Sequence, residues 1–275
     1  MSKNRLCEEI TNKIIAKLEQ GTGIFEMPFV NGLPKNRVTG KAYRGINLWL
    51  LDGGEYATFK QIQELGGKVK KGAKSHTVVF WKMLEVEEEE TGKEVKIPLL
   101  KQYKVFKIGE QTEGIEPTEV VEKFEHEKIE EAEKIIKEYP NPPTLTRASG
   151  KAYYRPFEDV VNIPPIEDFP DVNRYYSTFF HELVHSTGVI HRLNREGISN
   201  FDKFGSERYS KEELVAELGA SILCAITGID KHTLDHSASY IQSWITVLKN
   251  DNTFIINAAQ QAQKAVDHIL DTKFE

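Results

Sequence analysis

The sequence predicts an α+β protein in two parts: a small mixed α/β domain at residues 1–112, then an α-rich domain with a small sheet at residues 113–275. Three observations support this prediction. Apolar residues recur at helical spacing over several long stretches, whereas β-type runs are few and short. Residues 109–117 are rich in Gly, Glu, Thr and Pro and hold few apolar side chains, which is typical of a connection between domains.

Helices are expected wherever apolar side chains recur every three or four residues. The first such stretch covers residues 4–20, and Gly21 ends it. Thr58 and Gln61 form a capping-box pattern, so another helix should begin at Thr58 and stop at Gly66. The remaining helical stretches are residues 43–51, 118–138, 175–185, 210–223, 233–249 and 251–271.

Strands are expected at residues 77–81 and 99–106, where apolar and β-branched side chains gather. The acidic segment 87–93 between them is typical of an exposed hairpin turn. Two short extended runs, at 153–154 and 160–163, should form a small sheet that precedes the helix at 175–185.

Charge is divided unequally along the chain. The formal net charge is -6, but residues 1–112 carry 19 basic and 14 acidic side chains, whereas residues 113–275 carry 17 and 28. Within 31–82 the balance is 10 basic to 3 acidic. A basic first half is what a polyanion such as nucleic acid would bind.

The cysteines and the lengths of the apolar runs indicate the cellular compartment in which the protein is expected. Cys7 and Cys224 lie far apart in helical contexts, so the sequence predicts neither a disulfide framework nor a cysteine zinc module. The amino terminus is polar and charged, and no run approaches the roughly 18 apolar residues that cross a membrane. We therefore expect a cytoplasmic protein without a membrane partner.

The segment HELVH, residues 181–185, carries the strongest chemical signal. His181 and His185 lie four residues apart, so on a helix they point the same way and can hold one metal ion. Glu182 lies between them and has the place of the general base that takes a proton from water in zinc hydrolases. The apolar residues around the motif indicate a helix with one core face, which favours a metal site over a chance match.

Two histidines leave a catalytic zinc ion one protein ligand short. His191 is one candidate for the third ligand, because the spacing from His181 through Gly188 to His191 matches the metzincin pattern. Metzincins also place a methionine turn after the third histidine, whereas all three methionines of this chain precede the motif. His191 is therefore the weakest candidate.

The stretch 210–223 offers two carboxylates, Glu213 and Glu217, on one helical face. Small residues at 216, 219 and 220 would let this helix pack closely on the HELVH helix. Ser210 and Glu213 also fit a capping box, which would commit Glu213 to the start of its own helix, so both carboxylates stay open as the third ligand. The order Glu213, Ala216, Glu217 resembles gluzincins, which implies Glu213 as ligand and Glu217 as acceptor for a ligand histidine's other N–H.

The first half interleaves cations with rings. Cations can follow phosphates and rings can stack on bases, so this composition favours single-stranded nucleic acid bound without sequence readout. The candidate DNA-binding residues are Arg37, Lys41, Tyr43, Arg44, Asn47, Lys68, Lys70, Lys71 and Lys74. Lysine-rich loops are more often plain solvated surface, and the aromatic residues could be core.

Longer strings extend the comparison to nearly the whole chain. KNRVTGKAYRGIN (35–47) and TFKQIQELGGKVKKG (58–72) resemble the amino-terminal single-stranded-DNA-binding domain of ArdC-type antirestriction proteins. FHELVHSTG (180–188), RLNR (192–195), FGSE (204–207), EELVAELGA (212–220) and SYIQSW (239–244) are similar to the zincin-like metallopeptidase domain of that family. The acidic segment 87–90 and the charged helix 118–138 are not part of this resemblance.

The resemblance implies an antirestriction protein, carried by a plasmid or another mobile element, that binds single-stranded DNA and has a gluzincin-type fold. His181, His185 and Glu213 would hold one divalent ion, with zinc expected and manganese the alternative. Glu182 would activate water, and His236 or Tyr240 would stabilise the oxyanion. A protein substrate such as a restriction component would be its partner.

Two other functions remain open at this point. The metal site could be structural, with the protein shielding DNA or mimicking it through its acidic half. The chain could also be a general cytosolic metallopeptidase that has no role in nucleic-acid binding.

Overall fold

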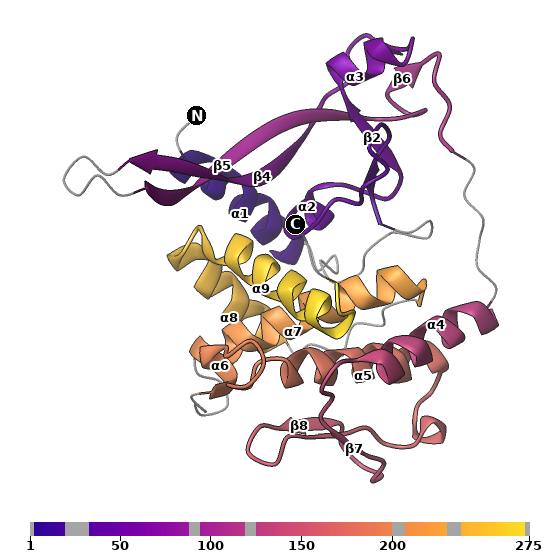
Figure 1. Ribbon diagram of the computed structural model, residues 1–275, viewed down its shortest axis with the longest axis vertical. Helices are drawn as coiled ribbons and strands as arrows, with labels where there is room; N and C mark the ends of the chain where they lie inside the picture. Colours follow the sequence, from indigo (N-terminus) through magenta and orange to yellow (C-terminus); the bar gives the residue numbers. More distant parts are fainter. Residues whose placement is uncertain are drawn as a thin grey trace.

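The structure is a computed structural model that describes residues 3–19, 33–87, 94–118, 125–199, 207–229 and 238–272. Its mixed helix and sheet architecture confirms the α+β prediction. The amino-terminal sheet lies at one end of the long axis, and the helices of the second half lie below it, followed by a small sheet at the other end (Figure 1). In the described part of the chain, no helix combines the length and the apolar character needed to cross a membrane.

The first part is built around one sheet and a long hairpin. The sheet has the order β1-β2-β5-β4, with β1 parallel to β2 and the other neighbours antiparallel. The hairpin pairs His76 with Val105 at one end and Glu87 with Glu94 at the other. The elements of the first part are α1 (Lys3–Glu19), β1 (Lys35–Asn36), α2 (Asn47–Leu50), β2 (Glu55–Thr58), α3 (Phe59–Glu64), β3 (Lys68–Val69), β4 (His76–Glu87), β5 (Glu94–Lys107) and β6 (Thr112–Glu113).

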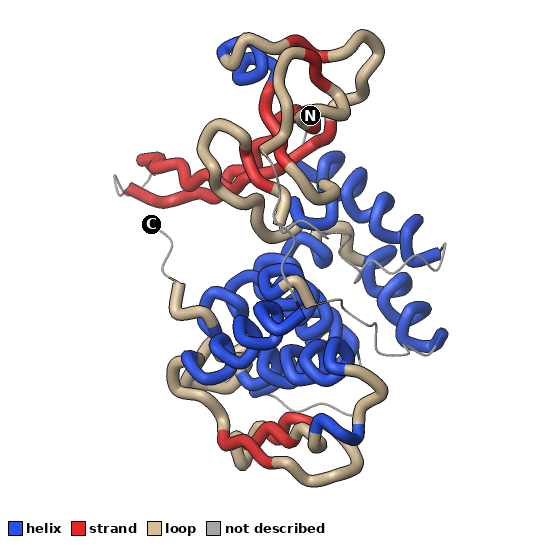
Figure 2. The backbone as a smooth tube through the Cα atoms, turned by 90° about the vertical axis from the view of Figure 1, so that its right-hand side faces the viewer, coloured by secondary structure: helices blue, strands red, loops and turns tan. Residues whose placement is uncertain are grey.

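The second part stacks helices on a three-stranded sheet of order β7-β9-β8 (Figure 2). Helix α7 packs against α5, α8 and α9, and α5 also contacts the small sheet through β8 and β9. The elements are α4 (Glu125–Glu138), β7 (Thr144–Thr146), β8 (Tyr153–Arg155), β9 (Val160–Asn162), the 3-10 helix η1 (Ile166–Asp168), α5 (Val172–Ser186), α6 (Glu196–Ser199), α7 (Glu207–Thr227), α8 (Ala238–Asn250) and α9 (Phe254–Ile269).

Local sequence signals explain several of these elements. The Thr58 hydroxyl accepts a hydrogen bond from the Gln61 amide, and the Gln61 side chain accepts one from the Thr58 amide, which confirms the capping box. The helix expected over 43–51 is confined to α2, because Gly45 takes a left-handed φ of 56° that a helix cannot contain. Strand β7 was not expected, and the turn at 88–93 lies outside the described residues.

One hydrophobic core runs through both parts. The first helix, α1, packs against α8 near the end of the chain, where the Thr11 hydroxyl donates to the Asn252 carbonyl at 2.7 Å. Residues 112–118 stay with the first part, since β6 pairs with β3 and the Thr118 hydroxyl donates to Glu55 at 2.8 Å. The first part therefore keeps its contacts up to Thr118, and its core continues into the helices that follow.

Candidate metal centre

Helix α5 presents the HELVH motif from a fixed, mostly buried position. Asp171 caps the helix, and its carboxylate accepts a hydrogen bond from the Arg174 amide at 2.8 Å. Phe179 and Phe180 are fully buried at 0% exposure, and their packing in the core fixes which face of the helix points inward. His181 and His185 lie one turn apart on the stripe beside this core face, where they are 5% and 7% exposed.

Helix α7 crosses α5 closely enough to add a carboxylate to this stripe. At Gly219, a Cβ atom would lie 2.7 Å from Cγ2 of Val184 on α5, so the contact requires glycine. Ala216 and Ala220 on the same helix are fully buried at 0% exposure. The small residues therefore allow the close approach that brings Glu213 to the two histidines.

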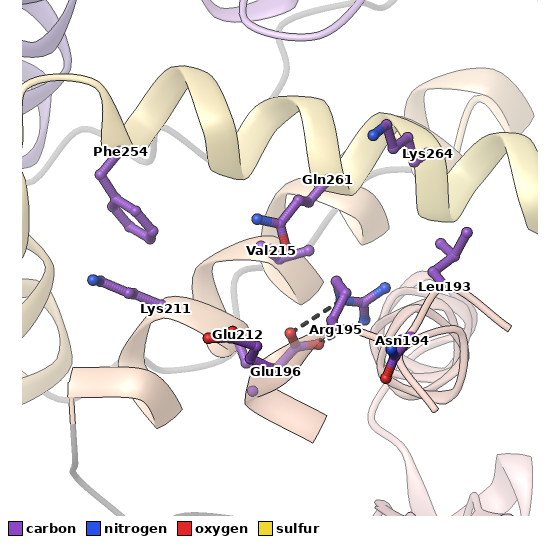
Figure 3. A pocket seen from close by; sticks show the side chains of 11 residues that line it. Leu193, Asn194, Arg195, Glu196, Lys211, Glu212, Val215, Phe254, Gln261 and Lys264 are labelled. Atoms are coloured by element: carbon purple, nitrogen blue, oxygen red, sulfur yellow. Dashed lines mark hydrogen bonds and ion pairs between the residues drawn. The ribbon is translucent and has the colours of Figure 1, made fainter. Parts of the chain in front are cut away.

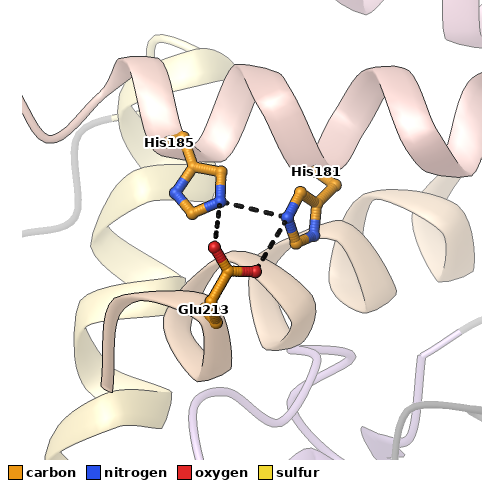
Figure 4. A group of neighbouring side chains, drawn as sticks. All are labelled: His181, His185 and Glu213. Carbon is orange, nitrogen blue, oxygen red and sulfur yellow. Dashed lines mark hydrogen bonds and ion pairs between the residues drawn. The ribbon is translucent and has the colours of Figure 1, made fainter. Parts of the chain in front are cut away.

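The three side chains converge on one point (Figure 4). The Nε2 atoms of His181 and His185 are 3.0 Å apart. Glu213 places Oε2 3.5 Å from the first of these nitrogens and Oε1 3.5 Å from the second. One donor atom from each of the three residues lies within 4.8 Å of the others, which is compatible with a single bound cation.

A second layer of carboxylates faces the outer nitrogens of both imidazoles. Nδ1 of His181 lies 3.0 Å from Glu217 Oε1, and Nδ1 of His185 lies 3.4 Å from Glu212 Oε1. Carboxylates in this position favour the tautomer with a proton on Nδ1, which leaves the Nε2 lone pair directed at the shared point. This is the carboxylate-histidine arrangement found around bound metal ions.

The electrostatics of the cluster favour positive charge. Burial alone would lower the pKa of both imidazoles, but the surrounding carboxylates outweigh it, raising the pKa of His185 to about 9 and that of His181 well above its ordinary value. Burial would raise the pKa of Glu213, yet the two histidines lower it far below its usual range. A divalent cation would satisfy the same carboxylates without bound protons, so the donor set fits a metal ion.

Glu212 is anchored by Arg195, and sequence reasoning missed this pair. The Arg195 guanidinium donates to Glu212 at 2.6 Å from Nη2 and at 3.0 Å from Nε, and both side chains are nearly buried at 5% and 6% exposure. Nη2 also donates to the Val184 carbonyl at 2.8 Å and Nη1 to the Thr187 hydroxyl at 2.6 Å. A pocket of about 520 Å³ borders the pair (Figure 3). The signal available in the sequence was the RLNR string that follows the motif.

His191 lies away from the cluster. It is 56% exposed, and its Nε2 lies 3.5 Å from Asp159 Oδ2 instead of facing the other two histidines. Asp159 also forms a bidentate pair with Arg192, both contacts being 2.8 Å. Burial would raise the pKa of Asp159, but the hydrogen bonds from Arg192 and Tyr154 lower it on balance. These contacts hold the segment after the motif against the small sheet.

Glu182 is half-buried, and burial raises its pKa more than the two neighbouring imidazoles lower it. A raised pKa suits a group that takes up and returns a proton near neutral pH. His236, one of the two residues considered for the oxyanion, lies outside the described residues. Tyr240 belongs to α8, but its side chain is also outside what the structure describes.

The candidate DNA-binding residues divide by exposure. Side chains that remain at least partly exposed are those of Arg37, Lys41, Arg44, Lys68, Lys70, Lys71 and Lys74. Tyr43 is only 4% exposed and Asn47 only 3%. The Asn47 amide donates to the Val79 carbonyl and accepts from the Val79 amide, both at 2.7 Å. Tyr43 and Asn47 are therefore buried parts of the fold and are not open to a bound strand.

Three of these cations also bind neighbouring groups. Arg37 Nη1 lies 3.4 Å from Glu55 Oε2. Lys70 Nζ donates to the carbonyls of Gly109 and Glu110 at 3.0 and 2.9 Å. Arg44 Nη2 lies 2.5 Å from Asp267 Oδ2 on α9. These contacts hold the three side chains in place, whereas Lys41, Lys71 and Lys74 are exposed on segments between the helices and strands.

Comparison with known proteins agrees with this architecture. Residues 4–106 match the model of the N-terminal domain of anti-restriction factor ArdC, and residues 130–261 match a zincin-like metallopeptidase model. DNA primase TraC of Escherichia coli is 34% identical over 96% of this chain, but the chain spans only 20% of TraC's length. Protein y4eC of Sinorhizobium fredii, described as uncharacterised, is 32% identical over 94% of this chain and 90% of its own length.

Two crystal structures of the antirestriction protein ArdC from the R388 plasmid have the same fold. The metal-free structure has a TM-score of 0.77 and 35% identity, covering 98% of this chain and 99% of that one. The Mn(II)-bound structure has a TM-score of 0.76 and 33% identity, covering 98% of both chains. With its two domain types in the same order, the chain belongs to the ArdC family of antirestriction proteins.

Proposed function

We propose that this protein binds single-stranded DNA and hydrolyses peptide bonds at a divalent metal held by His181, His185 and Glu213. The convergence of these three donors, each histidine backed by a carboxylate, is the observation that carries the proposal. The ArdC protein of plasmid R388 has a Mn(II)-bound structure, which supports a divalent ion as the ligand of this fold. Two imidazoles and one carboxylate are also a zinc ligand set, so we propose zinc as the resident ion and manganese as the alternative.

The side chains around the centre have separate roles in this mechanism. A bound divalent ion supplies Lewis acidity towards a peptide carbonyl. Glu182 takes the proton from the attacking water and returns it to the leaving amine, and its raised pKa fits both steps. Glu217 and Glu212 hold the two imidazoles in the tautomer that directs Nε2 inward. The substrate we propose is a protein component of a restriction system, as the family's antirestriction role suggests.

Metal analysis of the purified protein and of a Glu213→Gln variant tests the ligand set. We expect one ion per chain in the wild type and a large loss of affinity in the variant, with His191→Ala as the matched control that keeps its metal. A full complement of metal in Glu213→Gln would contradict the proposed ligand.

A Glu182→Gln variant tests whether peptide cleavage produces the antirestriction effect. The variant keeps the metal donors but removes the base, so we expect it to retain metal and DNA binding and to lose protection against restriction. Protection that is unchanged in Glu182→Gln would instead support a protein that shields DNA without cleaving anything.

A further inference from the structure

A groove separates the amino-terminal sheet from helix α9. Its volume is about 650 Å³, within the roughly 300–1,000 Å³ range typical of ligand pockets. Cationic and aromatic side chains line one wall, and amides line the other. The lining includes Arg44 and Phe80 from the first part and Asn257, Gln260, Gln263 and Lys264 from α9.

Two exposed rings continue the groove onto the sheet. Phe80 on β4 is 43% exposed and Tyr103 on β5 is 45% exposed. Their ring centroids are 5.6 Å apart in an edge-on arrangement, and Lys101 lies directly opposite Phe80 in the hairpin register. Tyr43, buried behind them, supports Phe80 at a centroid distance of 6.2 Å. Exposed rings beside a cation form the stacking surface that unpaired bases require.

Contacts across the groove hold its walls in position. Arg44 pairs with Asp267 at 2.5 Å, and the Gly45 amide donates to the Gln263 side chain at 3.1 Å. Gln263 also donates to Asp267 at 3.1 Å, so the acidic residue is surrounded by donors. The groove is thus preformed, and Asp267, the one acidic residue among its described lining residues, is paired with Arg44.

We propose that single-stranded DNA lies in this groove, with bases stacked on Phe80 and Tyr103 and base edges facing the amides of α9. The inference rests on the proposed single-stranded-DNA binding and locates it at the junction of the two parts, not on the lysine turn at 68–74. An Asn or Gln amide both donates and accepts, so it can pair with the edge of any base. Lys101 and Lys264 lie beside this path and compensate phosphate charge.

The occupant is a single strand because its bases expose their ring faces. In a duplex those faces are covered by the stack, so they could not stack on Phe80 and Tyr103. Stacking on Phe80 and Tyr103 does not depend on base identity, so binding should be tolerant of sequence and sensitive to salt.

Binding of a labelled oligothymidylate to the full chain, measured by fluorescence anisotropy, tests this placement. We expect Phe80→Ala and Tyr103→Ala each to weaken binding by about 5- to 150-fold, whereas Tyr103→Phe keeps the ring and should bind like the wild type. Lys264→Gln should reduce the slope of log affinity against log salt by about 0.7, the value for one phosphate contact. Phe157 is 93% exposed in the turn between β8 and β9, far along the chain from the groove, so Phe157→Ala is the matched aromatic control and should leave binding unchanged.

The outcomes separate this inference from the function on which it rests. If the wild type does not bind the single strand, the proposed DNA binding itself fails. If the wild type binds but the ring variants bind equally well, while Lys71→Gln and Lys74→Gln lose affinity, the strand lies on the lysine turn and the groove placement is overturned. Photocrosslinking of an iodouracil oligonucleotide to Phe80 or Tyr103 supports the placement, and crosslinks confined to residues 68–74 overturn it.

Discussion

Replacement of Arg195 by methionine should weaken both the fold and the metal centre, because this side chain supports Glu212. The guanidinium makes contacts of 2.6 and 3.0 Å with the carboxylate and also binds the Val184 carbonyl at 2.8 Å. Methionine fills a similar volume without a charge. The change therefore leaves the Glu212 carboxylate buried and without its main cationic partner.

The size of the effect follows from this burial. With side chains only 5% and 6% exposed, the pair is poorly screened by solvent, and removing one partner of such a pair costs about 3–5 kcal/mol of unfolding free energy. A double variant, Arg195→Met with Glu212→Leu, removes both charges and should recover most of that loss. It also removes the carboxylate beside Nδ1 of His185, so its metal affinity should stay about 10- to 100-fold below the wild type.

Denaturant unfolding in the presence of a chelator measures the first quantity, and metal titration calorimetry measures the second. We expect the single variant to be the least stable and the double variant to be stable but weak in metal binding. A loss below about 1 kcal/mol for Arg195→Met would refute the reasoning. The reasoning would also fail if the stability losses of Arg195→Met and Glu212→Leu, each measured alone, summed to that of the double variant within about 0.5 kcal/mol. The two side chains would then be independent.

Three further predictions concern the surroundings of the centre. Gly219→Ala should cost about 1–3 kcal/mol and lower the melting temperature, because the added methyl group meets Val184 at 2.7 Å. In the metal-free protein the surrounding carboxylates raise the pKa of both imidazoles, that of His185 to about 9 and that of His181 well above its ordinary value, so metal must displace protons from both. Affinity should therefore rise with pH through this range, and calorimetry in buffers of different ionisation enthalpy should show proton release that falls as the pH rises. The pKa of Asp159 is lowered in the folded protein, so its ionised carboxylate stabilises the fold fully above the ordinary pKa of aspartate. This stabilisation is lost as the pH falls through the lowered pKa, and Asp159→Asn should remove it from the pH dependence of the unfolding free energy.

The two histidines could be identified from sequence because their geometry is local. Four-residue spacing on a helix places both imidazoles on one stripe whatever the rest of the fold does. Glu213 was different, since a capping box with Ser210 competed with the ligand role. The structure removes that alternative, because α7 begins at Glu207 and Ser210 is inside the helix. The start of α7 at Glu207 thus leaves the Glu213 carboxylate available as a metal ligand.

The carboxylate partners of the imidazoles depend on how α7 crosses α5, which no local pattern contains. Glu217 came from a family resemblance, while Glu212 was overlooked because its partner Arg195 is 17 residues away along the chain. The basic character of the first half could be read from its composition, but which of its side chains are exposed could not. Tyr43 and Asn47 are buried, whereas Phe80, one of the aromatic residues of the first half that could have been core, is 43% exposed.

The same core that joins the two parts also limits how their functions can be separated. Helix α9 forms one wall of the groove and packs on α5 and α7, which carry the metal donors. Helix α1, from the first part, packs on α8 of the second, with Lys249 and Glu19 3.0 Å apart at the far end of the contact. A fragment that begins after Thr118 would expose both interfaces and lose α1. Loss of DNA binding in such a fragment would therefore report a damaged fold as readily as a missing surface, and point variants on the groove in the intact chain distinguish the two.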